Sequence, residues 1–120
     1  MKVLAIDAGA TKVSGAIVDK INNNTFNIDE AAIEIQYSDH PNFNGNFTTP
    51  NLNDQYQNIK ISDLESQQGN VYMDCIINLI KHFTSKEPLK IGIATAGIKD
   101  VNNRGITIMA NGPRMPEYLN

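Results

Sequence analysis

The sequence predicts an α/β domain whose mixed β-sheet combines an antiparallel three-strand meander with one parallel strand. Two observations favour this class. Residues 1–37 alternate segments rich in β-branched residues with short turns, which is the pattern of strands joined by tight connections. Residues 62–95 place a long amphipathic helix before another apolar strand, and a strand that follows such a crossover lies parallel to its neighbour.

The meander is expected to comprise three strands, at Lys2–Asp7, Lys12–Asp19 and Thr25–Tyr37. A turn at Lys20–Asn24, with three successive asparagines, separates the second strand from the third. Apolar and polar residues alternate at the end of the third strand, which we expect to be broken near Asp29 and Glu30.

Residues Ser38–Gln67 are rich in asparagine, carry scattered apolar residues and contain Pro41 and Pro50. A stretch of this length without regular structure is uncommon in a compact domain and is often functional or mobile. We expect a surface insertion with a short strand at Ile59–Ile61. A lid over a binding site is the alternative interpretation.

A helix is expected to begin near Ser62, because Ser62 and Glu65 have the spacing of a capping box. Apolar residues follow helical spacing over residues 71–83, and Pro88 forbids continuation beyond the following turn. A break at Gly69, giving two shorter helices, is the alternative.

The parallel strand is expected at Lys90–Thr95, paired with the first strand, which gives a sheet order of 3-2-1-4. A turn at residues 102–105 and a short β segment at Ile106–Ala110 follow. Pro113 and Pro116 exclude a central strand or a helix at the end of the chain.

Composition excludes several functions. The chain has 120 residues, 41% of them hydrophobic and 19% charged, which is typical of one folded domain. A net charge of −3 without blocks of like charge predicts no nucleic-acid partner. Cys75 is the only cysteine, so no disulfide framework forms within these residues. No apolar run approaches the ~20 residues of a membrane span, and we expect a cytoplasmic protein without a membrane partner.

The turn after the first strand carries a candidate phosphate site, made of Asp7, Gly9, Ala10, Thr11 and Lys12. Small residues let an anion approach backbone N–H groups, and a hydroxyl and an ammonium group add further contacts. A carboxylate at the end of a buried strand can hold hydrated Mg²⁺ against a phosphate. The alternative is a plain β-hairpin whose turn is small for steric reasons only.

Two segments, MKVLAIDAGATKVSGAIVD and IGIATAGIKDVNNRGITIMANGPRMPEYL, together resemble the ROK family of sugar kinases and sugar-responsive repressors. That family belongs to the superfamily of sugar kinases, Hsp70 and actin. The resemblance implies a ribonuclease H-like sheet over residues 1–120, as an incomplete N-terminal lobe of an actin-like ATPase domain. Residues 38–67 would be an Asn-rich insertion within this lobe.

The resemblance also implies roles for individual residues. Asp7 matches the acid near Mg²⁺ and phosphate, and the Gly9–Lys12 turn matches the loop over the β- and γ-phosphates. Ala96 and Gly97 match the small pair whose backbone abuts the sugar, and Asn111 matches an asparagine of the loop that closes the sugar cleft. The chain departs from the family pattern at Ala10, where glycine is usual, and at Ala96, near which proline or glycine is common.

The resemblance implies an ATP-dependent sugar kinase that transfers a phosphoryl group from Mg-ATP to a sugar hydroxyl. It places the catalytic base beyond Asn120, so we assign no catalytic residue to this chain and expect it to be inactive alone. A non-catalytic sugar-sensing regulator of the same family and another actin-like ATPase branch are the alternatives. We also expect self-association, such as a homodimer, because the edge of strand Lys90–Thr95 and one sheet face lack a cover.

Overall fold

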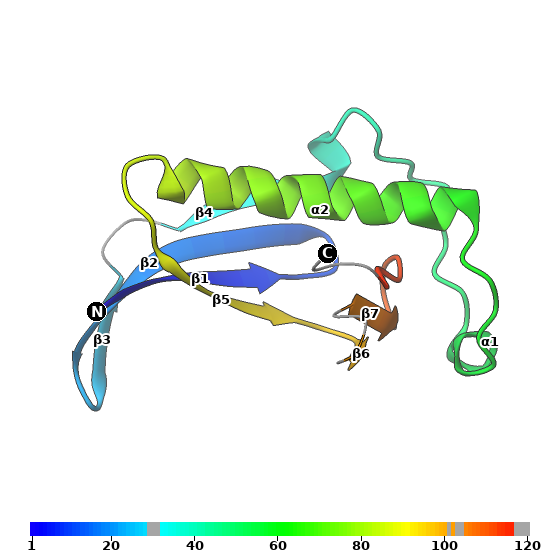
Figure 1. Ribbon diagram of the computed structural model, residues 1–120. Helices are drawn as coiled ribbons and strands as arrows, with labels where there is room; N and C mark the ends of the chain where they lie inside the picture. Colours follow the sequence, from blue (N-terminus) through cyan, green and yellow to red (C-terminus); the bar gives the residue numbers. More distant parts are fainter. Residues whose placement is uncertain (29–31, 101, 103–104, 117–120) are drawn as a thin grey trace. The chain divides into compact units, whose positions relative to one another are not determined.

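The computed structural model describes residues 1–28, 32–100, 102 and 105–116 of a mixed α/β protein (Figure 1). Contacts divide the chain into two units, and each is described by itself. The first unit comprises Met1–Tyr37 and Asp74–Thr95, and the second comprises Ser38–Met73 and Ala96–Asn120. Within the described residues, no helix is long and apolar enough to cross a membrane.

The first unit contains a mixed sheet, as the sequence predicts, with five strands where four were expected. Strand β1 pairs antiparallel with β2 and parallel with β5, and the order is β3-β2-β1-β5, with β4 also paired to β2. The bounds of the strands are Lys2–Ala8 for β1, Lys12–Asn22 for β2, Thr25–Ile28 for β3, Ile33–Gln36 for β4 and Lys90–Thr95 for β5. The predicted order 3-2-1-4 and the parallel crossover are therefore confirmed.

Two details of the meander differ from the prediction. The third predicted strand is divided into β3 and β4, and both pair with β2. The expected break at Asp29 and Glu30 lies outside the described residues. Strand β2 continues to Asn22, because one asparagine makes the turn compact: the N–H of Asn24 donates to the side-chain oxygen of Asn22 at 3.0 Å.

Alternate residues of β1 and β2 form the core of the first unit. Leu4 and Val13 are fully buried. The C-terminal half of helix α2, Asp63–Thr84, lies over this face (Figure 1). Its residues Leu79 and Phe83 are buried and lie next to Gly15 of β2. A Cβ atom at Gly15 would lie 2.7 Å from Cδ2 of Leu79, so the absence of a side chain there lets the helix approach the strand.

Helix α2 is continuous, and the alternative of a break at Gly69 is wrong. Its start agrees with half of the expected capping box, since the N–H of Glu65 donates to Oγ of Ser62 at 3.1 Å. Gly69 fits a close contact within the second unit, because a Cβ atom there would lie 3.3 Å from Cγ of Met115. The helix therefore accommodates a glycine where the packing needs one.

The Asn-rich segment of the second unit is more regular than the sequence suggests. It contains helix α1, Leu52–Tyr56, which was not predicted, whereas the predicted strand at Ile59–Ile61 is wrong. Asn58 ends α1 in the left-handed conformation, with φ 59°, and the N–H of Ile59 donates to the carbonyl oxygen of Asp54 at 3.1 Å. This helix-ending turn engages the N–H of Ile59, which is therefore not available to a neighbouring strand.

The rest of the second unit contains a short hairpin. Strands β6, Ile98–Asp100, and β7, Gly105–Ile108, pair antiparallel, so the predicted segment Ile106–Ala110 lies partly within β7, and β6 was not predicted. Of the predicted turn at 102–105, residues 103 and 104 lie outside the described residues. A Cβ atom at Gly105 would clash with the carbonyl oxygen of Pro116, so only glycine fits there.

Candidate functional site

The candidate phosphate turn lies between β1 and β2 and is closed by backbone hydrogen bonds. The N–H of Gly9 donates to the carbonyl oxygen of Lys12 at 2.9 Å. The hydroxyl of buried Tyr37 donates to the carbonyl oxygen of Gly9 at 3.0 Å. The backbone N–H of Tyr37 donates to the carbonyl oxygen of Thr11 at 3.2 Å. Tyr37 begins the 3₁₀ helix η1, Tyr37–Asp39, and was not recognised as a turn residue from the sequence. The turn is therefore held from within the first unit.

These hydrogen bonds decide which groups of the turn face solvent. The N–H of Gly9 is engaged, so it does not contribute to an anion cradle in this conformation. Neither Gly9 nor Ala10 has a positive φ, so alanine at position 10 brings no backbone strain. Ala10 and Thr11 are exposed, so the hydroxyl of Thr11 is accessible to a ligand.

Lys12 forms an ion pair with Glu34 across β2 and β4. Its Nζ lies 2.8 Å from Oε1 of Glu34, and both side chains are about half exposed, at 44% and 50%. Exposed pairs of this kind contribute only ~0–1 kcal/mol. A phosphate with two charges can therefore compete with Glu34 for the ammonium group. The sequence did not predict this partner.

Asp7 lies near the end of β1 on the sheet face opposite α2, and its side chain is exposed. It has no hydrogen bond or ion pair with another described residue. Its neighbours in the sheet are small, Ser14 on β2 and Ala94 on β5. These residues and Ala5, Ala16 and Gly92 line an open hollow of 740 Å³. The carboxylate is thus available to a ligand or a hydrated cation.

No group of three or more His, Cys, Asp or Glu side chains with metal-binding geometry occurs among the residues that the structure describes.

The predicted sugar-facing residues belong to the second unit. Gly97 has φ 98°, and a Cβ atom there would lie 2.6 Å from Cγ2 of Ile106, so both conformation and space require glycine. Ala96 and Asn111 are exposed, and Asn111 precedes Gly112, which has φ 133°. The small or exposed residues of the predicted phosphate site thus lie at a turn of the first unit, and those of the predicted sugar-facing set lie at turns of the second unit.

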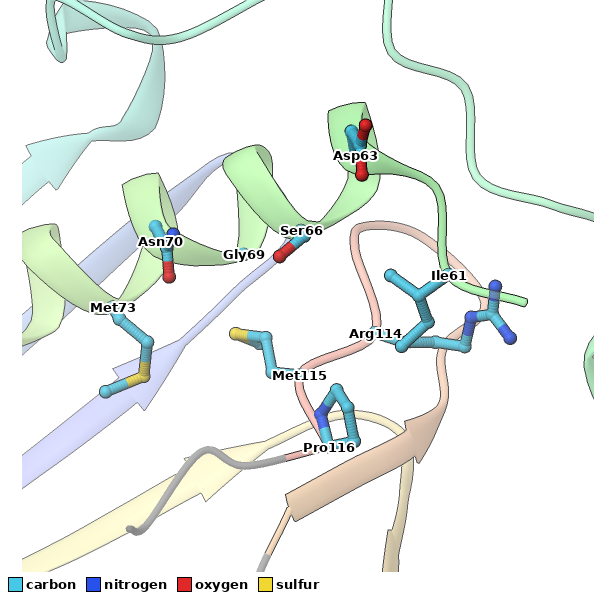
Figure 2. Close-up of a pocket in the computed structure, with 9 residues that line it drawn as sticks. All are labelled: Ile61, Asp63, Ser66, Gly69, Asn70, Met73, Arg114, Met115 and Pro116. Carbon is cyan, nitrogen blue, oxygen red and sulfur yellow. The ribbon is translucent and has the colours of Figure 1, made fainter.

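The second unit also contains a pocket of 370 Å³ between α2 and the segment around Met115 (Figure 2). Asp63, Ser66 and Asn70 supply a carboxylate, a hydroxyl and an amide from one face of the helix. The apolar part of the lining comes from Ile61, Met73, Met115 and Pro116. The sequence analysis did not predict this pocket, because its lining residues come from segments far apart in the chain.

Arg114 lies at the pocket wall, but its guanidinium group is engaged in a buried ion pair. Its Nη2 and Nε donate to the carboxylate of Glu65 at 2.7 and 2.9 Å, and Nη1 donates to the carbonyl oxygen of Ile59 at 2.8 Å. Arg114 is 4% exposed and Glu65 is 1% exposed. The hydrogen bonds to Glu65, and then its negative charge, raise the pKa of Arg114 against the opposing effect of burial. This cation therefore stabilises the fold and is not available to a ligand.

Comparison of the chain with models of protein families, with curated proteins and with solved structures gave no match.

Proposed function

We propose that this chain supplies the phosphate-binding and sugar-facing residues of an ATP-dependent sugar kinase of the ROK type. One observation carries the proposal: the exposed Asp7 lies at the carboxyl end of β1, beside the parallel strand β5 and before a tight turn. Ligands of open α/β sheets bind at the carboxyl ends of parallel strands. The small residues that line the hollow beside Asp7 leave room for a polyphosphate.

In this proposal Asp7 orients a hydrated Mg²⁺ ion, and the hydroxyl of Thr11 and the ammonium group of Lys12 contact the phosphates. Bound Mg²⁺ would neutralise charge on the transferred phosphoryl group and its leaving group. Ala96, Gly97 and Asn111 would contact the sugar whose hydroxyl accepts the phosphoryl group. No residue of this chain is assigned as the general base.

A second candidate is a non-catalytic member that senses a sugar. The observation that favours it is the internal hydrogen bond from the N–H of Gly9 to Lys12, which removes one donor from the phosphate cradle. A regulator needs the sugar contacts and not a complete phosphate site. The two candidates differ in whether the turn binds Mg-ATP.

The test is a titration of the isotope-labelled 120-residue chain with Mg-ATP, followed by its amide NMR signals. The kinase proposal predicts shifts at Asp7–Lys12, a weaker response to AMP, and loss of the response in Asp7→Asn. Asp19→Asn is the matched control, because Asp19 is an acid of the same sheet paired with Lys2 at the other end of β1. Absence of shifts at the turn, with a response of Ala96 and Gly97 to sugars, would favour the regulator.

A further inference from the structure

The face of the first unit's sheet that α2 leaves open carries large apolar side chains in solvent. Phe26 is 60% exposed and Ile28 is 66% exposed, and both lie on this face because they pair with Lys20 and Val18. A sheet normally covers an apolar face with another layer. We call this surface the open face.

The strand register arranges the open face in four rows that cross the strands. The first row holds Glu34, Ser14, Asp7 and Ala94, and it contains two exposed carboxylates, of which that of Glu34 is paired with Lys12. The second row holds only small residues, Ala16, Ala5 and Gly92. These two rows form the hollow beside Asp7.

The other two rows are bulky. The third row holds Ile28, Val18, Val3 and Lys90. The fourth holds Phe26 and Lys20, with Met1 beside them, since the N–H of Lys20 donates to the carbonyl oxygen of Met1. Successive rows are about 6.6 Å apart, because two residues of a strand separate them. One end of the open face is therefore small and acidic, and the other is large, apolar and basic.

We propose that the open face is an interface between two copies of this chain. Such a dimer has a two-fold axis that lies in the plane of the interface, runs perpendicular to the strands and passes between the second and third rows. This axis places the second row of each copy over the third row of the other copy. Small residues of one copy then face large residues of the other, so the stacked sheets interdigitate. The same axis places the fourth row over the first, which brings Lys20 within reach of Asp7 of the partner subunit.

The occupant is a second copy because both halves of the complementarity lie on the same face. An isologous interface requires a patch that fits itself, with residue i on j and j on i. The row of small residues supplies the complement in shape, and Asp7 and Lys20 supply the complement in charge. This inference goes beyond the proposed kinase function and does not depend on it. The two share Asp7, so the dimer and bound Mg-ATP would exclude one another.

Sedimentation velocity of the 120-residue chain over a concentration series tests the proposal. We expect a species of twice the 13.2 kDa chain mass at the higher concentrations. Lys20→Glu should weaken the dimer at least about tenfold, because two like charges then face each other at each of the symmetric contacts. Combining it with Asp7→Lys should restore the dimer. Lys60→Glu is the control, since Lys60 is an exposed lysine of the second unit and the change in net charge is the same.

Ala5→Glu places a carboxylate in the row of small residues and should abolish the dimer. Circular dichroism shows whether each variant is folded, and Lys20→Glu, at an exposed position, keeps the proposal testable if Ala5→Glu fails to fold. A wild-type chain that is monomeric at every concentration would overturn the inference. A dimer that neither Lys20→Glu nor Ala5→Glu weakens would overturn it as well. The amide shifts of Asp7–Lys12 with Mg-ATP in Lys20→Glu report the proposed function separately, because Lys20 is outside the phosphate turn.

Discussion

Each of the two units of this protein is stabilised internally by a different kind of interaction. In the first unit, alternate apolar residues of β1 and β2 pack against the C-terminal half of α2. In the second unit, buried polar side chains hold segments without regular structure in place. The side-chain amide of Gln55 donates to the carbonyl oxygens of Pro50 and Met109 at 2.6 and 2.8 Å, and its oxygen accepts from the N–H of Met109 at 2.8 Å.

The same contrast separates polar residues that hold the fold from those available to a ligand. Gln55, Gln68, Glu65 and Arg114 are buried, and each is hydrogen-bonded within the second unit. Asp7 is exposed and has no such bond with the described residues. A buried polar group that loses its partner destabilises a protein, whereas an exposed one can be changed with little effect on stability. The following predictions use this difference.

The largest effect is expected for Glu65→Gln, which leaves the guanidinium of Arg114 buried without its counter-ion. Breaking a buried pair typically lowers the free energy of unfolding by ~3–5 kcal/mol. Urea denaturation measures this change in the free energy of unfolding. The double variant Glu65→Leu, Arg114→Met is expected to recover part of the loss. Since the pKa of Arg114 is raised, its contribution is fully present at all pH values below the ordinary arginine range and is lost only above it. A loss below 1 kcal/mol (about the size expected for a surface pair) would show that the ion pair does not hold the second unit.

Gln55→Leu should lower the free energy of unfolding by about 2 kcal/mol, because it leaves the N–H and carbonyl oxygen of Met109 without their partner. The change keeps the size of the side chain nearly constant. Gln67→Leu is the matched control, since Gln67 is exposed on α2, and should have little effect. Equal urea midpoints for the two variants would refute the role of Gln55 in holding Met109.

In the first unit, Gly15→Ala should destabilise by roughly 1–3 kcal/mol through overpacking. The new Cβ atom would lie 2.7 Å from Cδ2 of Leu79. At Gly92, also within a strand, a Cβ atom would meet nothing within 4 Å, so Gly92→Ala should be neutral or slightly stabilising. Thermal unfolding at low protein concentration compares them, and an equal effect at both positions would contradict the close packing of α2 on β2.

The smallest effect on stability is expected for Glu34→Gln, below about 1 kcal/mol, because its pair with Lys12 is exposed. The change frees the ammonium group of Lys12, so affinity for Mg-ATP should rise a few-fold. Calorimetric titration measures the affinity. A fall in affinity would indicate that Glu34 itself assists the ligand, and not that it competes for Lys12.

The comparison also explains how far the sequence predicts the structure. The sheet order, the parallel strand and α2 were predicted, because apolar periodicity records which face of each element is buried. Helix α1 was missed, since its length of 5 residues leaves almost no period, and its signals are single residues, Asn51 and Asn58, at its ends. The ion pair of Glu65 and Arg114 was missed because 49 positions separate the two residues.

The candidate site was predicted in part. The sequence located Asp7 and the small turn, since both follow a recognisable apolar strand. It did not indicate that Tyr37 braces the turn or that Glu34 holds Lys12. Both partners come from the far end of the meander, and their contacts depend on the register of β4 against β2. Contacts of this kind follow from tertiary structure and leave no local pattern.

A crossed comparison of Asp7→Asn and Glu65→Gln tests most directly the central claim that Asp7 serves a ligand and Glu65 serves the fold. Each variant is measured twice, for its urea midpoint and for its amide shifts with Mg-ATP under conditions where it is folded. We predict that Asp7→Asn keeps the wild-type midpoint and loses the shifts at Gly9–Lys12, whereas Glu65→Gln unfolds at lower urea and keeps those shifts. An Asp7→Asn variant that binds Mg-ATP as the wild type does, or that is as unstable as Glu65→Gln, would contradict the account.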